Sequence, residues 1–466
     1  MSYPGIGTSG PSKFRLRSVD GRRALLIRPW FPTGMRRAGW WLLPTVCPLL
    51  LTPTAVRAQP VFAPLVPPPN PQSAQTFFST NGMTAESILE AAKADPESGN
   101  PLRWGPFAAH PRVDYQYINA SGIRQGTVNN PTNTVSTIQH LISPGVLVQM
   151  GPHWRVDAAL SLNYYTEKVL SDTFGYHVGI NGGVPYKDWV FGLGAALGSS
   201  ETSQTETAAQ TKQDTYSTTL TAVYGAMHRV SYDLSVSQNI VLTDELNDSY
   251  TWSTLNWLNY VVTPKTTVGV GLGGGYNLLE AGTESRDSTG TDSVFEQVQG
   301  RVVWHPRDRF SLSVSGGAHF QQFMSDSGTN DIESSVSPIY SLHAGYLPWD
   351  GTSFGLTASQ TIGNSLQSDE HTESTMVSLE FRQRLLKNLS FAVTPNYSLT
   401  DYRSNTNPNA AANRVDEVLG ISVSLSTVLF KKFAVSTFFS FADNQSDDEF
   451  YSYETRQFGF HIGYRF

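Results

Sequence analysis

The 466-residue chain is poor in charge, rich in aromatic side chains and almost free of cysteine. Charged residues make up 15% of it and aromatic residues 12%, whereas soluble proteins carry roughly 25% charged residues. A net charge of −7 excludes the basic surface of a nucleic-acid-binding protein, so we expect no nucleic-acid partner. The single cysteine, Cys47, excludes a disulfide framework and a thiolate metal site. We expect no cofactor and no bound metal ion.

Residues 35–58 have the pattern of a secretory signal peptide. Arg36 and Arg37 form its basic start, 40–51 form a short apolar core, and small residues at 56–58 precede the expected cleavage point. The apolar run is interrupted by prolines and is too short to span a bilayer comfortably, which disfavours an uncleaved anchor helix. We therefore expect this segment to be cleaved after export through the inner membrane.

The segments on either side of this signal have different characters. We interpret residues 1–34 as coding sequence upstream of the true start, because Met35 opens a complete signal by itself. Residues 59–104 begin as a proline-rich stretch, which predicts an extended periplasmic linker. Within them, 83–95 (MTAESILEAAKAD) predicts one short amphipathic helix. We interpret this helix as a packing or plug element.

From residue 105 to residue 466 the chain repeats segments of alternating polarity. In the segment TMVSLEFRQR, for example, Leu379 and Phe381 lie on one face and Glu380 and Arg382 on the other. Alternation with a period of two predicts β-strands that have one apolar face and one polar face.

The connections between these segments alternate between tight and long. Eight tight turns are predicted at 151–153, 185–188, 227–229, 263–265, 305–309, 348–351, 386–388 and 430–432. Long polar stretches lie between them, among them 120–134, 199–214, 281–292 and 403–414. With an opening strand near 110–119 and a closing strand at 451–466, the pattern predicts about eighteen strands.

Two architectures produce repeated alternating strands: a soluble β-sandwich or propeller, and a transmembrane barrel. The alternation of short and long connections, the export signal, the terminal strand and the absence of a later long apolar run all favour the barrel. We therefore predict an all-β fold, a transmembrane antiparallel up-and-down β-barrel over residues 105–466. We expect it to lie in the bacterial outer membrane.

The closing strand is apolar and aromatic at alternate positions: Phe458, Phe460, Ile462, Tyr464 and Phe466. This ending resembles the last strand of Gram-negative outer-membrane β-barrels of the porin type, in which it is the signal read by the barrel-assembly machinery. The resemblance covers roughly residues 105–466. It implies outer-membrane lipid, lipopolysaccharide and the barrel-assembly machinery as partners, small polar solutes as cargo, and compatibility with a homo-oligomer.

The polar face of the strands supplies the candidate pore-lining residues. They are Arg112, Asp114, Arg155, Asp157, Asp233, Gln297, Gln299, Arg301, Glu380, Arg382, Arg384, His461 and Arg465. Opposed acidic and basic walls would favour polar solutes, as rings of charge do in other pores. The alternative is that these groups pair with one another and stiffen the barrel.

Other motifs carry weaker signals. Gly269, Gly271 and Gly274 have the G-x-G-x-x-G spacing of a nucleotide site, but a strand and a loop follow instead of a helix, so we expect these glycines on the lumen side of a strand. We interpret the acids of the long stretches, such as Asp369 and Glu373, as solvated charge. The alternative is a divalent cation shared with lipopolysaccharide.

The sequence favours a non-enzyme, because no catalytic motif occurs in a convincing context. His371, beside two acids in a long connection, is the one arrangement that resembles a catalytic site. We expect a porin-like channel for passive diffusion of small polar solutes. The alternatives are an exporter of surface polysaccharide, which would have a lumen of one charge sign, and a non-conducting structural or adhesion barrel.

Overall fold

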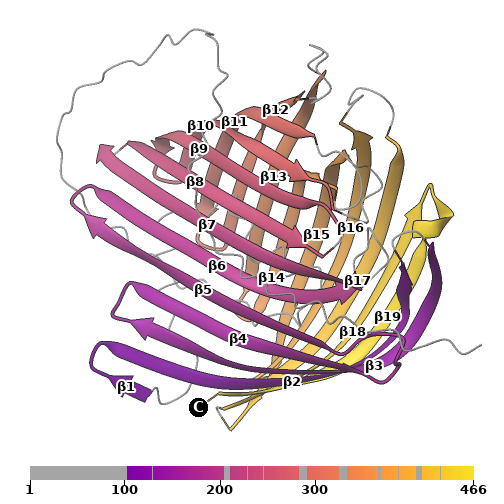
Figure 1. The fold of residues 1–466 in the computed structure, drawn as a ribbon. Coiled ribbons are helices and arrows are strands. Elements are labelled where there is room, and N and C mark those ends of the chain that lie inside the picture. The colour runs from indigo at the N-terminus through magenta and orange to yellow at the C-terminus, as the bar shows by residue number, and fades with distance from the viewer. Residues whose placement is uncertain are drawn as a thin grey trace, which may run out of the picture. The chain divides into compact units, whose positions relative to one another are not determined.

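A computed structural model describes residues 102–465, except 128–129, 204–209, 228, 245, 283–290, 325–332, 366–368, 387, 406–411 and 431. The predicted signal peptide, the upstream segment and the predicted helix at 83–95 lie outside the described residues, as does Phe466. The described part consists of antiparallel strands that run obliquely around a barrel (Figure 1). It contains no α-helix, and therefore none that is long and apolar enough to cross a membrane.

Nineteen strands and one short 3-10 helix make up the described chain. They are β1 (Leu102–Trp104), β2 (Phe107–Thr127), β3 (Asn130–Met150), β4 (Trp154–Tyr165), β5 (Thr173–Tyr186), β6 (Trp189–Ser203), β7 (Gln210–Met227), β8 (Val230–Thr243), β9 (Asp248–Thr263), β10 (Thr266–Glu280), β11 (Asp292–Arg307), β12 (Phe310–Met324), β13 (Glu333–Trp349), β14 (Thr352–Asn364), β15 (Glu370–Leu386), β16 (Leu389–Ser404), β17 (Arg414–Leu429), β18 (Phe433–Ser446), η3 (Glu449–Tyr451) and β19 (Tyr453–Arg465).

Each strand from β2 to β19 pairs with the next one along the chain, and β19 pairs back with β2. The closing ladder runs from Arg456–Ser121 to Arg465–Arg112. β1 lies outside the ring and folds back on the start of β2. The described strands therefore form a closed barrel of eighteen strands, as predicted, and closure gives each strand a partner on both sides.

The two faces of the wall differ in the way that the alternation predicts. Leu258, Val270 and Leu272 are each close to 60% exposed on one face. On the other face, Arg301 of β11 reaches Asp233 of β8 across the two strands between them. A contact of that reach is feasible only on the concave side of a curved sheet, so the polar face is the inner face. The apolar face lies outside.

All eight tight turns occur within the predicted ranges. The long connections differ from expectation in two places. The stretches 120–134 and 199–214 belong mostly to the strand pairs β2–β3 and β6–β7, which extend into these polar regions. The β2–β3 ladder continues there with register shifts between Ala120 and Ile123 and between Gln125 and Thr127. Backbone hydrogen bonds continue a ladder whether or not its side chains alternate, so the polar sequence there did not end the strands.

The ladder between β13 and β14 ends earlier than those on either side of it. It stops at Tyr340–Gln360, although β13 continues to Glu333 and β14 to Asn364. β12 stays paired with β13 up to Glu333, and β14 stays paired with β15 up to Asn364. The two strands therefore separate towards the long connections, leaving a seam in the wall.

Candidate channel lining

The first charged group of the inner face joins both ends of the barrel sequence. Arg112 of β2 lies 3.0 Å from Asp157 of β4, measured from Nη2 to Oδ1. Its neighbour Asp114 lies 3.0 Å from Nε2 of His461 on the closing strand. Gly145 of β3 makes the first contact feasible, because a Cβ at that position would come within 3.1 Å of the Arg112 side chain. The group therefore connects β19, the last strand, with β2, the first strand of the ring.

The second group lies on β8, β9 and β11. The Arg301 guanidinium pairs with the Asp233 carboxylate and donates from Nε to Asn259 Oδ1 at 2.8 Å. The Asn259 amide donates to Asp233 at 2.9 Å, so the three side chains form a closed triangle. Arg301 also lies over the Trp257 ring, 4.4 Å from its centroid. Both charged side chains are only about one fifth exposed.

Glycines of β10 make room for this second group. A Cβ on Gly271 would lie 2.9 Å from the Trp257 ring, and one on Gly269 would lie 2.5 Å from Asn259 Oδ1. These two glycines therefore face inward, as predicted. Gly274 does not, because in β10 it is an odd number of residues from both and shares the outer face with Leu272. The glycine spacing is a packing feature of a strand.

The remaining candidates lie on the same inner face of their strands by alternation. Gln299 donates to Gln297 at 3.0 Å, and Arg382 lies 2.6 Å from Glu380. The others are Arg155, two residues before Asp157; Arg384, two residues after Arg382; and Arg465, opposite Arg112 in the closing ladder. The candidates thus form separate groups around the wall, and in three of these groups an arginine pairs with a carboxylate.

The sequence interpretation missed where β14, β15 and β16 lie at their long-connection ends. His371 and Glu373 of β15 are on the strand face that points outward nearer the tight turns. At the long-connection end, however, they contact the inner face of other strands. The His371 ring lies 5.1 Å from that of Phe323 on β12, and Glu373 accepts a hydrogen bond from Ser337 on β13. These strand ends therefore lie inside the barrel, against its wall. Pro338 within β13 was the available signal, because proline marks a strand edge.

The polar residues of this crossing are packed against other strands and connections. His371, the candidate catalytic histidine, is fully buried, and its Nδ1 lies 3.1 Å from Asn405 Oδ1. Asp369 accepts hydrogen bonds from Thr291 and Asn405, and Glu373 is likewise bonded, so neither is a solvated loop charge. Among the described residues, no group of His, Cys, Asp and Glu is arranged to hold a metal ion.

A second missed feature covers the other face of these strand ends. The Arg414 guanidinium lies between two tyrosine rings, 3.7 Å from the centroid of Tyr402 and 3.9 Å from that of Tyr451. Tyr451 belongs to η3, in the connection between β18 and β19, and is 2% exposed. No local pattern predicts this stack, because Tyr402 lies in β16, Arg414 begins β17 and Tyr451 lies in η3.

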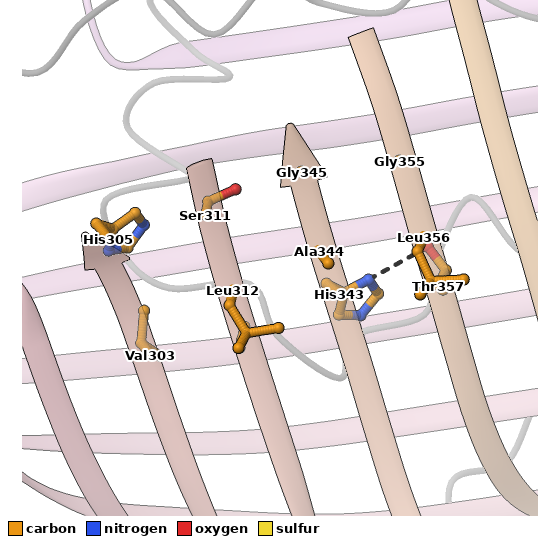
Figure 2. A pocket seen from close by; sticks show the side chains of 11 residues that line it. Val303, His305, Ser311, Leu312, His343, Ala344, Gly345, Gly355, Leu356 and Thr357 are labelled. Carbon is orange, nitrogen blue, oxygen red and sulfur yellow. Dashed lines mark hydrogen bonds between the residues drawn. The ribbon is translucent and has the colours of Figure 1, made fainter. Parts of the chain in front are cut away.

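A shallow hollow lies on the wall near the tight-turn ends of β11 to β14 (Figure 2). Its lining includes His305, Ser311, His343 and Thr357, and His343 Nδ1 lies 3.5 Å from the Thr357 hydroxyl (Figure 2). Its side chains come from adjacent strands of one sheet, and Val303, Leu312 and Leu356 add apolar surface beside the polar groups. The hollow is open and does not form an enclosed site.

Comparisons with known proteins find likeness only among solved structures; no family model and no curated protein matches the chain. The copper transporter OprC is 10% identical with a TM-score of 0.40, over 74% of this chain and 62% of that chain. The FrpB iron transporter from Neisseria meningitidis is 9% identical with a TM-score of 0.44, over 78% and 63%. The outer membrane protein opdK from Pseudomonas aeruginosa is 8% identical with a TM-score of 0.40, over 77% and 98%. The chain thus spans less than two thirds of the first two proteins, and at these scores no family or substrate is identified.

The outer surface of the wall indicates a location in a membrane. Its outside is apolar between two zones of aromatic residues: Trp189 stacks with Phe191 and packs on Tyr224 near the tight turns, and Trp252 stacks with Tyr250 and Tyr276 nearer the long connections. A closed barrel with an apolar exterior, aromatic zones and a polar interior satisfies every backbone group within lipid. The chain is an outer-membrane β-barrel. Phe458 and Ile462 of its closing strand face outward, as the alternation predicts.

Proposed function

We propose that this outer-membrane barrel is a porin-like channel for passive diffusion of small polar solutes. The observation that carries the proposal is the inner face, where charged and amide side chains line a closed wall of eighteen strands. Barrels of 16–18 strands are wide enough to enclose an aqueous channel. Polar side chains facing such a channel remain hydrated, which explains why the alternation keeps them on this face.

The thirteen candidate residues act in this proposal as an electrostatic lining. Paired charges of opposite sign do not give the channel a strong preference for cations or anions. They order water near the wall and favour polar over apolar solutes. Size exclusion then depends on side chains that project from the wall, and selectivity by charge is weak.

The alternatives make different demands on the same wall. An exporter of an anionic polysaccharide would need a lumen of one sign, and the pairs Arg112–Asp157, Arg301–Asp233 and Arg382–Glu380 do not favour it. A structural or adhesion barrel would need no lining at all. The barrel-assembly machinery and lipopolysaccharide remain proposed partners on the strength of the closing strand and the membrane location.

Planar-bilayer recordings of the refolded protein test the proposal. We expect discrete conductance steps with a cation-to-anion permeability ratio near one. The absence of steps would contradict the channel and leave the structural barrel standing. A strong one-signed selectivity would instead favour the exporter.

A further inference from the structure

The ends of β14, β15 and β16 cross the inside of the barrel at the side of the long connections. Asn364 at the end of β14 donates to Ser249 on β9 at 3.1 Å. Asp369, in the β14–β15 connection, accepts from the backbone and the hydroxyl of Thr291, which precedes β11. In the ring, β9 is five strands away from β14, so these contacts span the interior.

The seam between β13 and β14 gives this hairpin a place to bend. Below Tyr340–Gln360 the hairpin is part of the wall, with continuous ladders on both sides. Above it, no ladder joins β14 to β13, so the hairpin is attached to β13 only through side chains such as the Ser337–Glu373 pair. A strand end without a backbone ladder on one side moves at a lower cost than one held on both sides.

The contacts that hold the tip against the wall are mostly polar. Two carboxylates accept these hydrogen bonds: Asp369 from Thr291, which precedes β11, and Glu373 from Ser337 on β13. His371 adds one ring contact with Phe323. Polar contacts of this kind exchange readily for water, unlike a large apolar interface. The hairpin end is therefore held by contacts that can form and break, and we call the Asp369 and Glu373 contacts the latch.

We propose that the β14–β15 hairpin is a movable constriction of the channel, closed by the Asp369 and Glu373 contacts and opened by bending at the β13–β14 seam. The proposal rests on the channel function proposed above and names its regulation. In the latched position the hairpin narrows the mouth on the side of the long connections. Release moves it towards the line of the wall and widens the path for solutes.

The first test removes the latch charges without changing side-chain size. Asp369→Asn and Glu373→Gln are each expected to raise the ratio of wide to narrow conductance states roughly tenfold, because the extra stability of a hydrogen bond to a charged group over a neutral one corresponds to about a tenfold change in an equilibrium constant. The matched control is Glu370→Gln: its carboxylate is on the same hairpin but accepts from Asn413 at 2.7 Å, on the neighbouring connection. The control is expected to behave like the wild type.

The second test uses a reversible disulfide to hold the hairpin in the latched position and then release it. The variant T291C/D369C places two thiols where the latch contact lies, in a chain whose only natural cysteine, Cys47, lies in the predicted signal peptide. Oxidation is expected to form the cross-link on intact cells, seen as a mobility shift, and to hold the narrow state. Reduction is expected to give wider states than the wild type.

The outcomes separate this proposal from the channel proposal. Failure to cross-link, or a cross-linked and a reduced protein that conduct alike, overturns the latch while wild-type conductance keeps the channel. The same holds if Asp369→Asn, Glu373→Gln and Glu370→Gln are indistinguishable. If no variant in any state conducts, both proposals are overturned.

Discussion

The Arg301 side chain illustrates how this wall holds charge at the scale of single residues. Its guanidinium has a carboxylate, an amide and an indole face as partners, so each part of it has a counterpart. Burying a charge is costly unless it is paired and hydrogen-bonded. The pairing and the lining interpretations of the sequence therefore do not exclude each other, since a paired group still presents polar atoms to the lumen.

Neutralising either partner of this pair is expected to change ion selectivity in opposite directions. Arg301→Gln leaves the Asp233 charge uncompensated and favours cations, whereas Asp233→Asn favours anions. The permeability ratio should change about fivefold, because one unit charge at 4 Å is worth about 1 kcal/mol in water. Reversal potentials in a salt gradient measure it. The double variant is the control and should return close to the wild type; shifts of the same sign in both single variants would contradict the lining role.

Gly271 is expected to be intolerant of a side chain for a purely local reason. Gly271→Val places methyl groups into the Trp257 ring and displaces it from Arg301, at a cost of about 1–3 kcal/mol in the free energy of unfolding. Denaturant unfolding in detergent measures this cost. Gly300→Val is the matched control, because Gly300 of β11 has open space around its Cβ position. Equal stability of the two variants would show that the Trp257 contact is not tight.

At the scale of elements, the closing strand combines two requirements. Its outer face meets lipid and packs on neighbouring strands, as Phe460 does on Tyr117 at 5.3 Å and Tyr464 on Phe433 at 4.8 Å. Its inner face brings His461 to Asp114 and so joins the last strand to the first. A strand with both contacts has one register in which to close, because a slip of one residue exchanges the faces.

The terminal aromatic is expected to matter for assembly and not for the folded barrel. Deleting Phe466 should lower the amount of protein in the outer membrane severalfold while the protein that does assemble unfolds at the wild-type temperature. Membrane fractionation and heat-modifiable gel mobility measure the two quantities. Phe466→Trp keeps an aromatic ring and should assemble normally. Normal yield after deletion would remove the assembly-signal interpretation.

The β14–β15 hairpin shows the opposite relation between an element and its sequence. Leu379 and Phe381 alternate with polar neighbours as in any other strand of the wall. Nearer its tip the same outer face carries His371 and Glu373, whose polarity suits water or protein and not lipid. The loss of apolar character on that face agrees with its position inside the barrel.

At the scale of the whole molecule, the segment before the barrel is a second candidate for controlling the channel. We predict that deleting residues 59–104 from the exported protein leaves the barrel assembled and increases unit conductance, if the predicted helix at 83–95 is a plug. Bilayer recordings and gel mobility measure both effects. Replacing residues 59–104 with a flexible linker of equal length is the control, because it keeps a chain attached to the barrel but removes the predicted helix. Unchanged conductance would limit the segment to a linker.

A protein that carries both the 59–104 deletion and a latch variant separates the two candidate constrictions. If the plug and the latched hairpin act at different points of the channel, the two increases in conductance should add. If they act at the same point, the second change should have no further effect on conductance.

The class of the fold, the strand count and the eight tight turns could be predicted from the sequence, and the alternation assigns each candidate residue to one face of its strand. These follow from local rules: a period of two fixes the faces, and a tight turn fixes which strands are neighbours. Lipid outside and water inside then determine which face is which. Arg112, Asp233 and Arg301 lie on the polar face for this reason.

Which of these residues contact one another, and where the strands leave the ring of the wall, depends on long-range contacts that the sequence pattern does not encode. Arg301 and Asp233 are 68 positions apart, and their contact depends on the curvature of three intervening ladders and on the space left by Gly269 and Gly271. The inward fold of β14–β15 depends on contacts with β9, β12 and β13, which no local pattern encodes. Alternation fixes the face of a strand relative to its neighbours, whereas the path of the strand through space is set by the sum of long-range contacts.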